Sequence, residues 1–233
     1  MVKLIIDNKE IEAEEGKNLL QEIEAEEGKN LLQACLDNNI YIPNLCYLHG
    51  MDNPPASCRM CFVEIEGEHK PVTSCTVRVK DGMVVKTDTP DIRQLQRTAL
   101  QLLLSVHDVD CAHCPANKKC ELQRIAKFLK VGLKPKRLEL LLKEPEIDDE
   151  HPLLDYYPNR CVLCGKCIHV CKTKLGQPLL AFARRGFYTT ISFYGEKPAS
   201  DLNSSCKNCL ACVEICPVSA ITLKNDSDQI AEA

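Results

Sequence analysis

The sequence predicts an α+β protein in which N-terminal strands are followed by helices, and in which both are organised around cysteines. Short β-branched and alternating segments precede residue 88, whereas helical periodicity begins directly after it. Cysteines make up 16 of the 233 residues, well above ordinary usage. Large aromatic residues are few, with five Phe and no Trp. We therefore expect bound inorganic groups to contribute to folding.

The N-terminal part has strand composition. VKLII at 2–6 predicts a strand, DNK a turn, and IEAEE at 11–15 the second strand of a hairpin. CFVEIEG at 61–67 predicts a further strand. We expect 72–79 and 83–87 to form another hairpin around the turn KDG.

A tandem repeat interrupts this pattern. Residues 10–21 and 22–33 are both EIEAEEGKNLLQ. Removal of either copy leaves a continuous strand, turn and helix leading to Cys35, so we expect the fold to need only one. A local duplication or a recording error explains the repeat better than a solenoid, because twelve residues are too few for such a unit.

Two helices are predicted in the middle of the chain. The first starts at Thr89 as the cap, with Pro90 at its first position. Its expected apolar face consists of Ile92, Leu95, Leu102 and Val106. The second is expected at 119–131, with Gly132 as its stop. Its expected apolar face consists of Leu122, Ile125, Ala126 and Leu129.

Composition excludes several classes of protein. No run of eighteen apolar residues could span a bilayer, and the N-terminus lacks the features of a secretory signal. We therefore expect a cytoplasmic protein, where cysteines serve metals or catalysis rather than disulfides. A net charge of −4 and the lack of a basic run argue against a nucleic-acid partner.

The last eight cysteines form two C-x2-C-x2-C-x3-C runs, at 161–171 and 206–216. Such a pair is typical of two [4Fe–4S] clusters, in which the fourth cysteine of each run ligates the other cluster. Zinc is the alternative, although structural zinc usually takes two spaced C-x2-C pairs. The expected sets are Cys161, Cys164, Cys167 and Cys216 for one cluster, and Cys206, Cys209, Cys212 and Cys171 for the other.

The first block, Cys46, Cys58, Cys61 and Cys75, places three thiols in a loop and the fourth on a later segment. This arrangement is similar to a plant-type [2Fe–2S] site, although its first gap is longer, and zinc remains the alternative.

The middle block holds only Cys111, Cys114 and Cys120, which leaves one ligand missing. His107 ends the preceding helix and is the candidate for that place, with His113 as its rival. A neutral imidazole in place of a thiolate would alter the potential of the cluster.

Cys35 stands apart from all blocks, on an apolar helical stretch. We expect it to be buried and inert. A reactive Cys35 would be the only free nucleophile for the alternative in which this chain is an enzyme in its own right.

The complete series, with phrases such as IPNLCYLHG, CRMCFVEIEG and NRCVLCGKC, resembles an iron–sulfur module found in three related proteins. These are the large peripheral subunit of respiratory complex I, the [FeFe]-hydrogenases and the small diaphorase subunit of NAD(P)-linked hydrogenases. The resemblance implies a β-grasp [2Fe–2S] domain at 1–88, a helical His/Cys3 [4Fe–4S] domain at 89–142, a linker at 143–154 and a ferredoxin-like 2[4Fe–4S] domain at 155–233.

The resemblance also implies a function and partners. One [2Fe–2S] and three [4Fe–4S] clusters would relay electrons between a flavin-containing NAD(P)-reactive subunit and a hydrogenase catalytic subunit, without a catalytic residue on this chain. Only 17 residues follow Cys216, and no nucleotide-binding glycine motif is present. An NAD(P)-dependent formate dehydrogenase or another complex I-related oxidoreductase is the alternative assembly.

Overall fold

The computed structural model describes residues 2–7, 22–25, 28–176, 178–193 and 209–224. The chain forms two compact units, residues 1–100 and 101–233. Both units combine helices with short strands, as the sequence predicts.

The first unit contains a mixed five-stranded sheet in the order β2-β1-β5-β3-β4. The strands are β1 (Val2–Ile6), β2 (Glu22–Ala25), β3 (Phe62–Ile65), β4 (Val72–Thr73) and β5 (Met83–Lys86). β1 is antiparallel to β2 and parallel to β5, whereas β3 is antiparallel to both β5 and β4. β1 has the predicted bounds.

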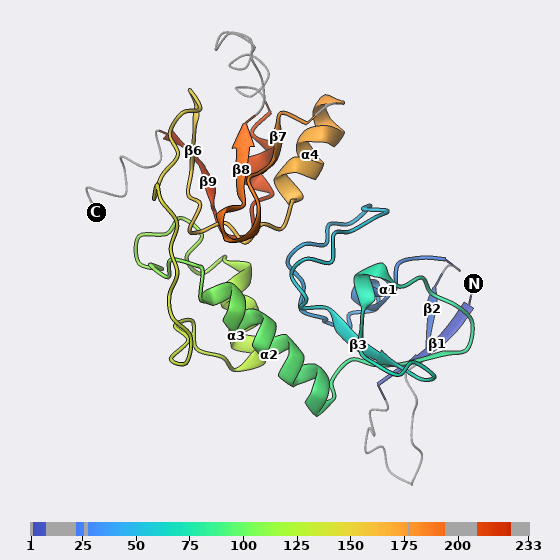
Figure 1. Ribbon diagram of the computed structural model, residues 1–233. Helices are drawn as coiled ribbons and strands as arrows, with labels where there is room; N and C mark the ends of the chain where they lie inside the picture. The colour runs from blue at the N-terminus through green and yellow to red at the C-terminus, as the bar shows by residue number, and fades with distance from the viewer. Residues whose placement is uncertain (1, 8–21, 26–27, 177, 194–208, 225–233) are drawn as a thin grey trace. The chain divides into compact units, whose positions relative to one another are not determined.

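Helix α1 (Leu31–Asp37) belongs to the core that covers this sheet; Figure 1 shows the helix beside β1, β2 and β3. Its Leu31, Leu32 and Cys35 are buried in one apolar cluster with residues of β1, β3 and β5. Asn30 caps the helix, because its side-chain oxygen accepts a hydrogen bond from the Gln33 backbone at 3.2 Å. The Asn30 amide also donates to the Cys75 carbonyl. One side chain thus joins the helix to a segment that carries a candidate ligand.

The second copy of the tandem repeat supplies β2, the cap and the start of α1. The strand predicted at 11–15 lies in the first copy, outside the described residues.

The predicted hairpin around KDG is wrong. β4 and β5 both pair with β3 and not with one another. Residues 77–79 instead bond to the segment before α1, where Leu31 N–H donates to Val77 and Gly28 N–H donates to Val79. Residues 77–79 are therefore held by backbone hydrogen bonds to a distant segment. The residue types around the KDG turn do not reveal such bonds.

Helix α2 (Pro90–Leu104) begins as predicted, with the Thr89 hydroxyl accepting from Ile92 N–H at 3.3 Å. Its buried positions differ from the predicted ones. Ile92, Leu100 and Leu104 are fully buried, whereas Leu95 and Leu102 are exposed.

Helix α3 (Glu121–Leu129) buries the four predicted apolar residues, from Leu122 to Leu129. Its stop is different, because Lys130 takes the left-handed conformation expected of Gly132. Cys111 and Cys114 lie between the two helices, as predicted.

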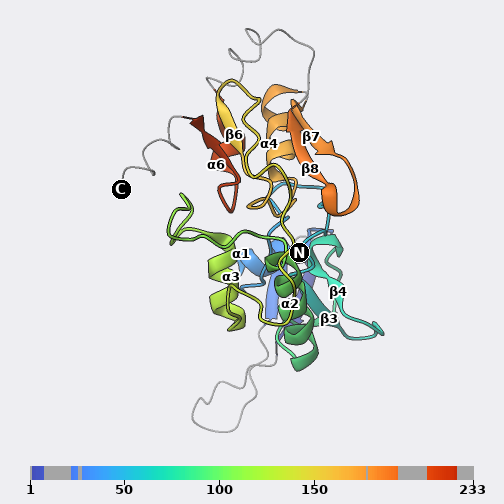
Figure 2. The same cartoon turned by 60° about the vertical axis from the view of Figure 1, so that its left-hand side comes forward.

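In the described residues after 150, the second unit has two antiparallel strand pairs and two α-helices. β6 (Leu154–Tyr156) pairs with β9 (Ile221–Leu223), and β7 (Leu180–Ala183) pairs with β8 (Thr190–Phe193). Helix α4 (Lys166–Leu175) precedes β7, and α6 (Ala211–Glu214) precedes β9 (Figure 2). Within the described part of the chain, no helix is long and apolar enough to cross a membrane.

The repeat provides a matched pair of variants. Asn30→Ala removes the cap of α1 and the donor to the buried Cys75 carbonyl, so we expect the free energy of unfolding to fall by about 1 to 3 kcal/mol. Asn18 is the same residue of the other copy, and we expect Asn18→Ala to leave that free energy unchanged. Urea unfolding measures both. Equal losses in the two variants would contradict the assignment of the second copy to the core.

Candidate iron–sulfur sites

The first set of thiols is buried in the first unit. Cys46, Cys58 and Cys61 lie in the loop between α1 and β3, and Cys75 lies on the 3-10 turn Ser74–Thr76. The Cys46 and Cys58 sulfurs are hydrogen-bonded at 3.4 Å. Ser74 donates to the Cys61 carbonyl through its backbone N–H at 2.8 Å and its hydroxyl at 2.9 Å. The fold thus brings two distant segments together.

Hydrogen bonds between the thiols of this set lower the pKa of one member of each pair and raise the pKa of the other, Cys58 or Cys75. A hydrogen bond with Cys58 lowers the pKa of Cys46 to about 5, while the same bond and burial raise the pKa of Cys58. In the second pair, a hydrogen bond with Cys75 lowers the pKa of Cys61. Thiolates are the form that binds metal.

The middle set lies in the second unit. Cys120 is the residue before α3, and burial raises its pKa, with smaller contributions from Cys114 and Cys111. Cys111 and Cys114 are therefore near enough to Cys120 to influence its pKa. All three are half-buried.

His107 and His113 differ sharply in their surroundings. Burial lowers the pKa of His107 to about 4, so the ring is neutral at pH 7. The ring is hydrogen-bonded to the Arg160 backbone, and its buried Nδ1 has no partner among the described residues. His107 lines a small cavity in which none of the lining residues is a cysteine. The His113 side chain is 69% exposed, and its Nδ1 lies 2.7 Å from Asp110 Oδ2.

The hydrogen bonding of the His107 ring is compatible with a metal ligand, although the cavity that it lines contains none of the three thiols of the middle set. A histidine that ligates a metal usually directs its other ring nitrogen to a backbone carbonyl or carboxylate, which sets its tautomer. The Arg160 backbone provides such a partner, and the free Nδ1 provides the lone pair.

The third set combines three cysteines of the run at 161–171 with Cys216 from the run at 206–216. Burial raises the pKa of Cys164 to about 12, with further contributions from Cys161 and Cys216. Burial also raises the pKa of Cys167, and the charges of Cys161, Cys164 and Cys216, followed by that of Cys212, add to this shift. Cys216 therefore lies with the three close cysteines of the earlier run.

The fourth set shows the reciprocal arrangement. Cys171, Cys209 and Cys212 line a narrow apolar cavity together with Leu154, Leu180 and Phe193. Cys171 belongs to the earlier run and the other two belong to the later one. Cys206, the remaining predicted member, lies outside the described residues.

The backbone around the thiols fits an anionic group. A non-glycine residue with positive φ lies inside three of the C-x2-C pairs: Arg59 (φ 53°), Leu163 (φ 51°) and Leu210 (φ 46°). Such left-handed residues are uncommon when they are not glycine. Alternation of right- and left-handed residues turns successive N–H groups into a concave anion site, a feature of many iron–sulfur sites. Sequence reasoning missed these three residues, because no side chain marks them.

Backbone N–H groups also donate to sulfurs of the candidate ligands. Leu163 donates to Cys161 at 3.4 Å, Leu179 to Cys171 at 3.2 Å and Ala220 to Cys216 at 3.2 Å. Such bonds stabilise thiolate charge and tune cluster potentials. Among the described residues, no three His, Cys, Asp or Glu side chains meet at a position that suits a single metal ion.

Cys35 is separate from all four sets, as predicted. It is 0% exposed in the core of the first unit. Burial, with the nearby Asp7 carboxylate, raises the pKa of Cys35 to about 12.

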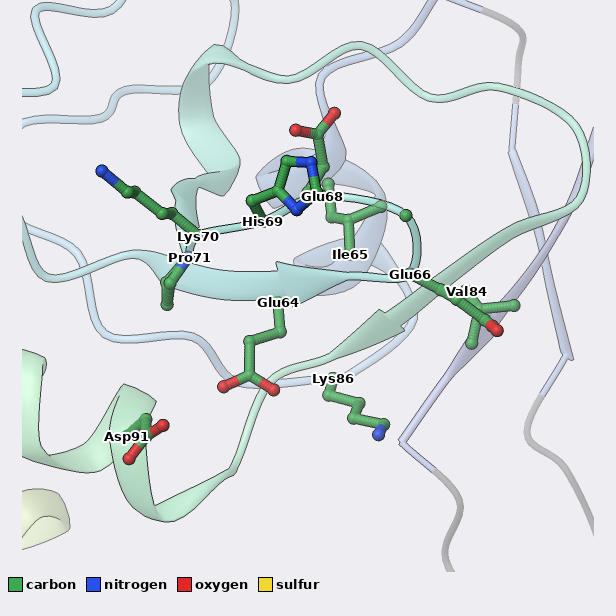
Figure 3. A pocket seen from close by; sticks show the side chains of 11 residues that line it. Glu64, Ile65, Glu66, Glu68, His69, Lys70, Pro71, Val84, Lys86 and Asp91 are labelled. Carbon is green, nitrogen blue, oxygen red and sulfur yellow. The ribbon is translucent and has the colours of Figure 1, made fainter.

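The first unit also has an open hollow of about 460 Å³ beside β3 and β5. Figure 3 shows the side chains of Glu64, Lys86 and Asp91 around it. It contains no cysteine, so it is distinct from the candidate cluster sites.

Three family models match the chain in the order of these sets. A 2Fe-2S iron-sulfur cluster binding domain matches residues 21–90, the NADH-ubiquinone oxidoreductase-G iron-sulfur binding region matches 96–133, and a 4Fe-4S binding domain matches 202–222. The chain therefore contains iron–sulfur binding domains of the [2Fe–2S] and [4Fe–4S] types.

More particularly, the chain is similar to subunits of NADH-ubiquinone oxidoreductase and of an NADP-reducing hydrogenase. It is 33% identical over 96% of its length to the NADH-ubiquinone oxidoreductase 75 kDa subunit of Reclinomonas americana. It is 33% identical over its whole length to the NADP-reducing hydrogenase subunit HndD of Solidesulfovibrio fructosivorans. It is also 33% identical over 96% of its length to NADPH-Fe(3+) oxidoreductase subunit alpha of Geobacter sulfurreducens. The chain spans 24% to 38% of the length of these relatives.

A solved structure is similar over nearly the whole chain. It is the crystal structure of an NAD+-reducing [NiFe]-hydrogenase in the H2-reduced state, with a TM-score of 0.79 and 26% identity. The match covers 96% of this chain and 87% of that one.

The surroundings of Cys35 predict its reactivity. With a pKa of about 12, only about one thiol in 10⁴ is ionised at pH 8, against about one in ten for a free thiol with pKa 9. We expect Cys35→Ala to keep the full iron content. In the native protein, we expect Cys35 to resist iodoacetamide until the chain unfolds, as peptide mass spectrometry would measure. Rapid native alkylation at this residue would contradict the buried, inert assignment.

Proposed function

We propose that this chain is an electron-transfer subunit with one [2Fe–2S] and three [4Fe–4S] clusters. It relays electrons between a flavin-containing NAD(P)-reactive subunit and a hydrogenase catalytic subunit. The observation that carries the proposal is the reciprocal placement of cysteines in the second unit, where Cys216 lies with the earlier run and Cys171 with the later one. This exchange is typical of a paired-cluster ferredoxin.

Four ligand sets follow from the proposal. The first unit contributes the [2Fe–2S] ligands, and His107 completes the middle set. The sets are Cys46, Cys58, Cys61 and Cys75; His107, Cys111, Cys114 and Cys120; Cys161, Cys164, Cys167 and Cys216; and Cys171, Cys206, Cys209 and Cys212.

The proposed domains are a β-grasp domain at 1–88, a helical domain at 89–142, a linker at 143–154 and a ferredoxin-like domain at 155–233. The sheet order β2-β1-β5-β3-β4, with the parallel β1–β5 pair beside α1, supports the first. The crossed cysteine sets support the last.

Direct backbone bonds join the proposed ligand loops of the second unit. Asp108, next to His107, donates to the Asn159 carbonyl at 2.8 Å. Glu121, next to Cys120, donates to the Pro217 carbonyl at 3.1 Å, and Pro217 follows Cys216. These bonds hold the middle set against the Cys161 set.

The clusters supply one-electron exchange when bound, with potentials set by their ligands, hydrogen bonds and burial. The residues of this chain bind them, exclude water and fix their spacing. A series of one-electron carriers lets a two-electron reaction at a flavin be delivered in single steps. The names of two relatives, an NADP-reducing hydrogenase subunit and an NAD+-reducing hydrogenase, support this choice of partners.

Metal analysis tests the cofactor content. We expect the chain, purified without oxygen, to hold about 14 iron atoms and to show a broad visible absorption that dithionite bleaches. Stoichiometric zinc in a colourless protein would contradict the proposal.

Isolation from the native host tests the relay. The tagged chain should co-purify with a flavin-bearing subunit and a hydrogenase subunit. Recovery with a formate-oxidising subunit instead would keep the relay but replace its terminal enzyme.

The two histidines provide a matched test of the middle set. We expect His107→Ala to lose or remodel one [4Fe–4S] cluster, with a loss of up to about 4 iron atoms per chain. His113→Ala should change neither iron content nor the electron paramagnetic resonance spectrum. The His113 ring is exposed, and its Nδ1 already interacts with the Asp110 carboxylate. The opposite pattern would transfer the ligand role to His113.

A further inference from the structure

Residues 28–33 end the second copy of the repeat and contact both segments that carry thiols of the first set. We call these residues the anchor segment. Its backbone is bonded to the chain that follows the 3-10 turn. Leu31 N–H donates to the Val77 carbonyl at 2.9 Å. Gly28 N–H donates to the Val79 carbonyl at 3.1 Å. The main chain thus fixes the register between the anchor segment and that turn.

Asn30 has two roles at the N-terminus of α1. Its Oδ1 accepts a hydrogen bond from Gln33 N–H at 3.2 Å, which caps the helix. Its amide group donates to the Cys75 carbonyl. Asn30 is 6% exposed and Cys75 is 0% exposed. A cap requires only the oxygen acceptor, so the amide group acts on the ligand segment and not on the helix.

Gln33 connects the anchor segment to the first ligand loop. Its Oε1 accepts a hydrogen bond from the Tyr47 hydroxyl at 2.8 Å, and its Nε2 donates to Asp37 Oδ1 at 2.5 Å. Lys29 Nζ lies 2.6 Å from the other oxygen of the Asp37 carboxylate. The bond to Asp37 orients the amide, because only its oxygen can accept from Tyr47. Tyr47 directly follows Cys46, so this chain of polar contacts holds the backbone beside that ligand.

Arg78 makes a further connection to the same loop. Its guanidinium group donates to the Asp52 carbonyl at 2.7 Å and to the Gly28 carbonyl at 3.3 Å. Asp52 lies between Cys46 and Cys58 in the sequence. The anchor segment is therefore linked to the ligand loop at two points and to the 3-10 turn by the Asn30 amide.

We propose that the anchor segment is a positioning element of the [2Fe–2S] site. Asn30 and Gln33 hold the Cys75 turn and the Cys46 loop at a fixed separation, which sets the geometry and the reduction potential of the cluster. The inference rests on the ligand set of the proposed function. Reduction adds one electron and breaks no bond. Without the Asn30 amide, the negative end of a buried carbonyl beside a ligand is left uncompensated, which disfavours the added electron.

Asn30→Ser separates the two roles of Asn30, because serine caps a helix about as well as asparagine but lacks the amide donor. The full-length chain is reconstituted with iron and sulfide and titrated with electron paramagnetic resonance detection. We expect the [2Fe–2S] midpoint to fall, so that at the wild-type midpoint the reduced-to-oxidised ratio is about threefold lower. The g values of the reduced cluster should change as well.

Tyr47→Phe tests the link through Gln33. It keeps the buried ring and removes only the hydroxyl that Gln33 accepts from. We expect the g values to change and the EDTA concentration that removes half of the [2Fe–2S] signal to fall about tenfold, because residues that orient ligands contribute about this much to metal affinity.

The first copy of the repeat supplies a matched control. Asn18 is the counterpart of Asn30 in that copy, and Asn18→Ser should leave the midpoint and the g values unchanged. Tyr188→Phe, which removes an exposed hydroxyl of the second unit, is the control for Tyr47→Phe. The [4Fe–4S] signals of each sample should stay at their wild-type midpoints. An equal shift in Asn18→Ser would overturn the assignment to the anchor segment.

The wild-type spectrum separates failure of the proposed function from failure of the inference. A wild-type chain without a [2Fe–2S] signal contradicts the proposed function itself. If that signal is present, variants that keep the wild-type g values, midpoint and EDTA resistance overturn the positioning role alone. A weaker signal with unchanged g values and midpoint also overturns it, because the segment would then only stabilise the fold. Should Asn30→Ser fail to fold, Tyr47→Phe decides the inference.

Discussion

Burial of negative sulfur charge is the constraint on which the rest of the structure depends. A buried thiolate is costly unless hydrogen-bond donors or positive charge surround it. The chain meets this requirement mainly with its backbone: Leu163, Leu179 and Ala220 donate N–H groups to sulfurs of the proposed ligands. Left-handed residues inside the C-x2-C pairs fit the same requirement, because alternating right- and left-handed residues form concave N–H sites for anions. The strained conformation of a residue such as Arg59 is thereby explained by the site it borders.

The same constraint organises the second unit. Cys161 and Cys216 are far apart in the sequence, and the antiparallel pair β6–β9 brings their flanking segments together. The bond between Glu121 and Pro217 then fixes the middle loop against this pair. Electron transfer between carriers needs fixed spacing rather than a moving part. A unit whose loops are joined by short backbone bonds is suited to that task.

The sequence predicted much of the local structure, and its errors have a common cause. The start of α2 at Thr89 and the buried face of α3 follow from capping and periodicity within a few residues. The hairpin around KDG failed because Val77 and Val79 bond to the segment before α1, a non-local choice. Leu102 was expected in a core and is exposed, because helical period alone does not say which side of a leucine-rich helix is covered.

The sequence by itself determined the chemistry, because the spacing of cysteines limits which ligands can reach one cluster. It also set Cys35 apart from that chemistry. Only the tertiary structure decided what surrounds each sulfur. The structure buries Nδ1 of His107 and leaves the ring of His113 exposed. Burial and hydrogen-bond partners are properties of packing, and no local pattern encodes them.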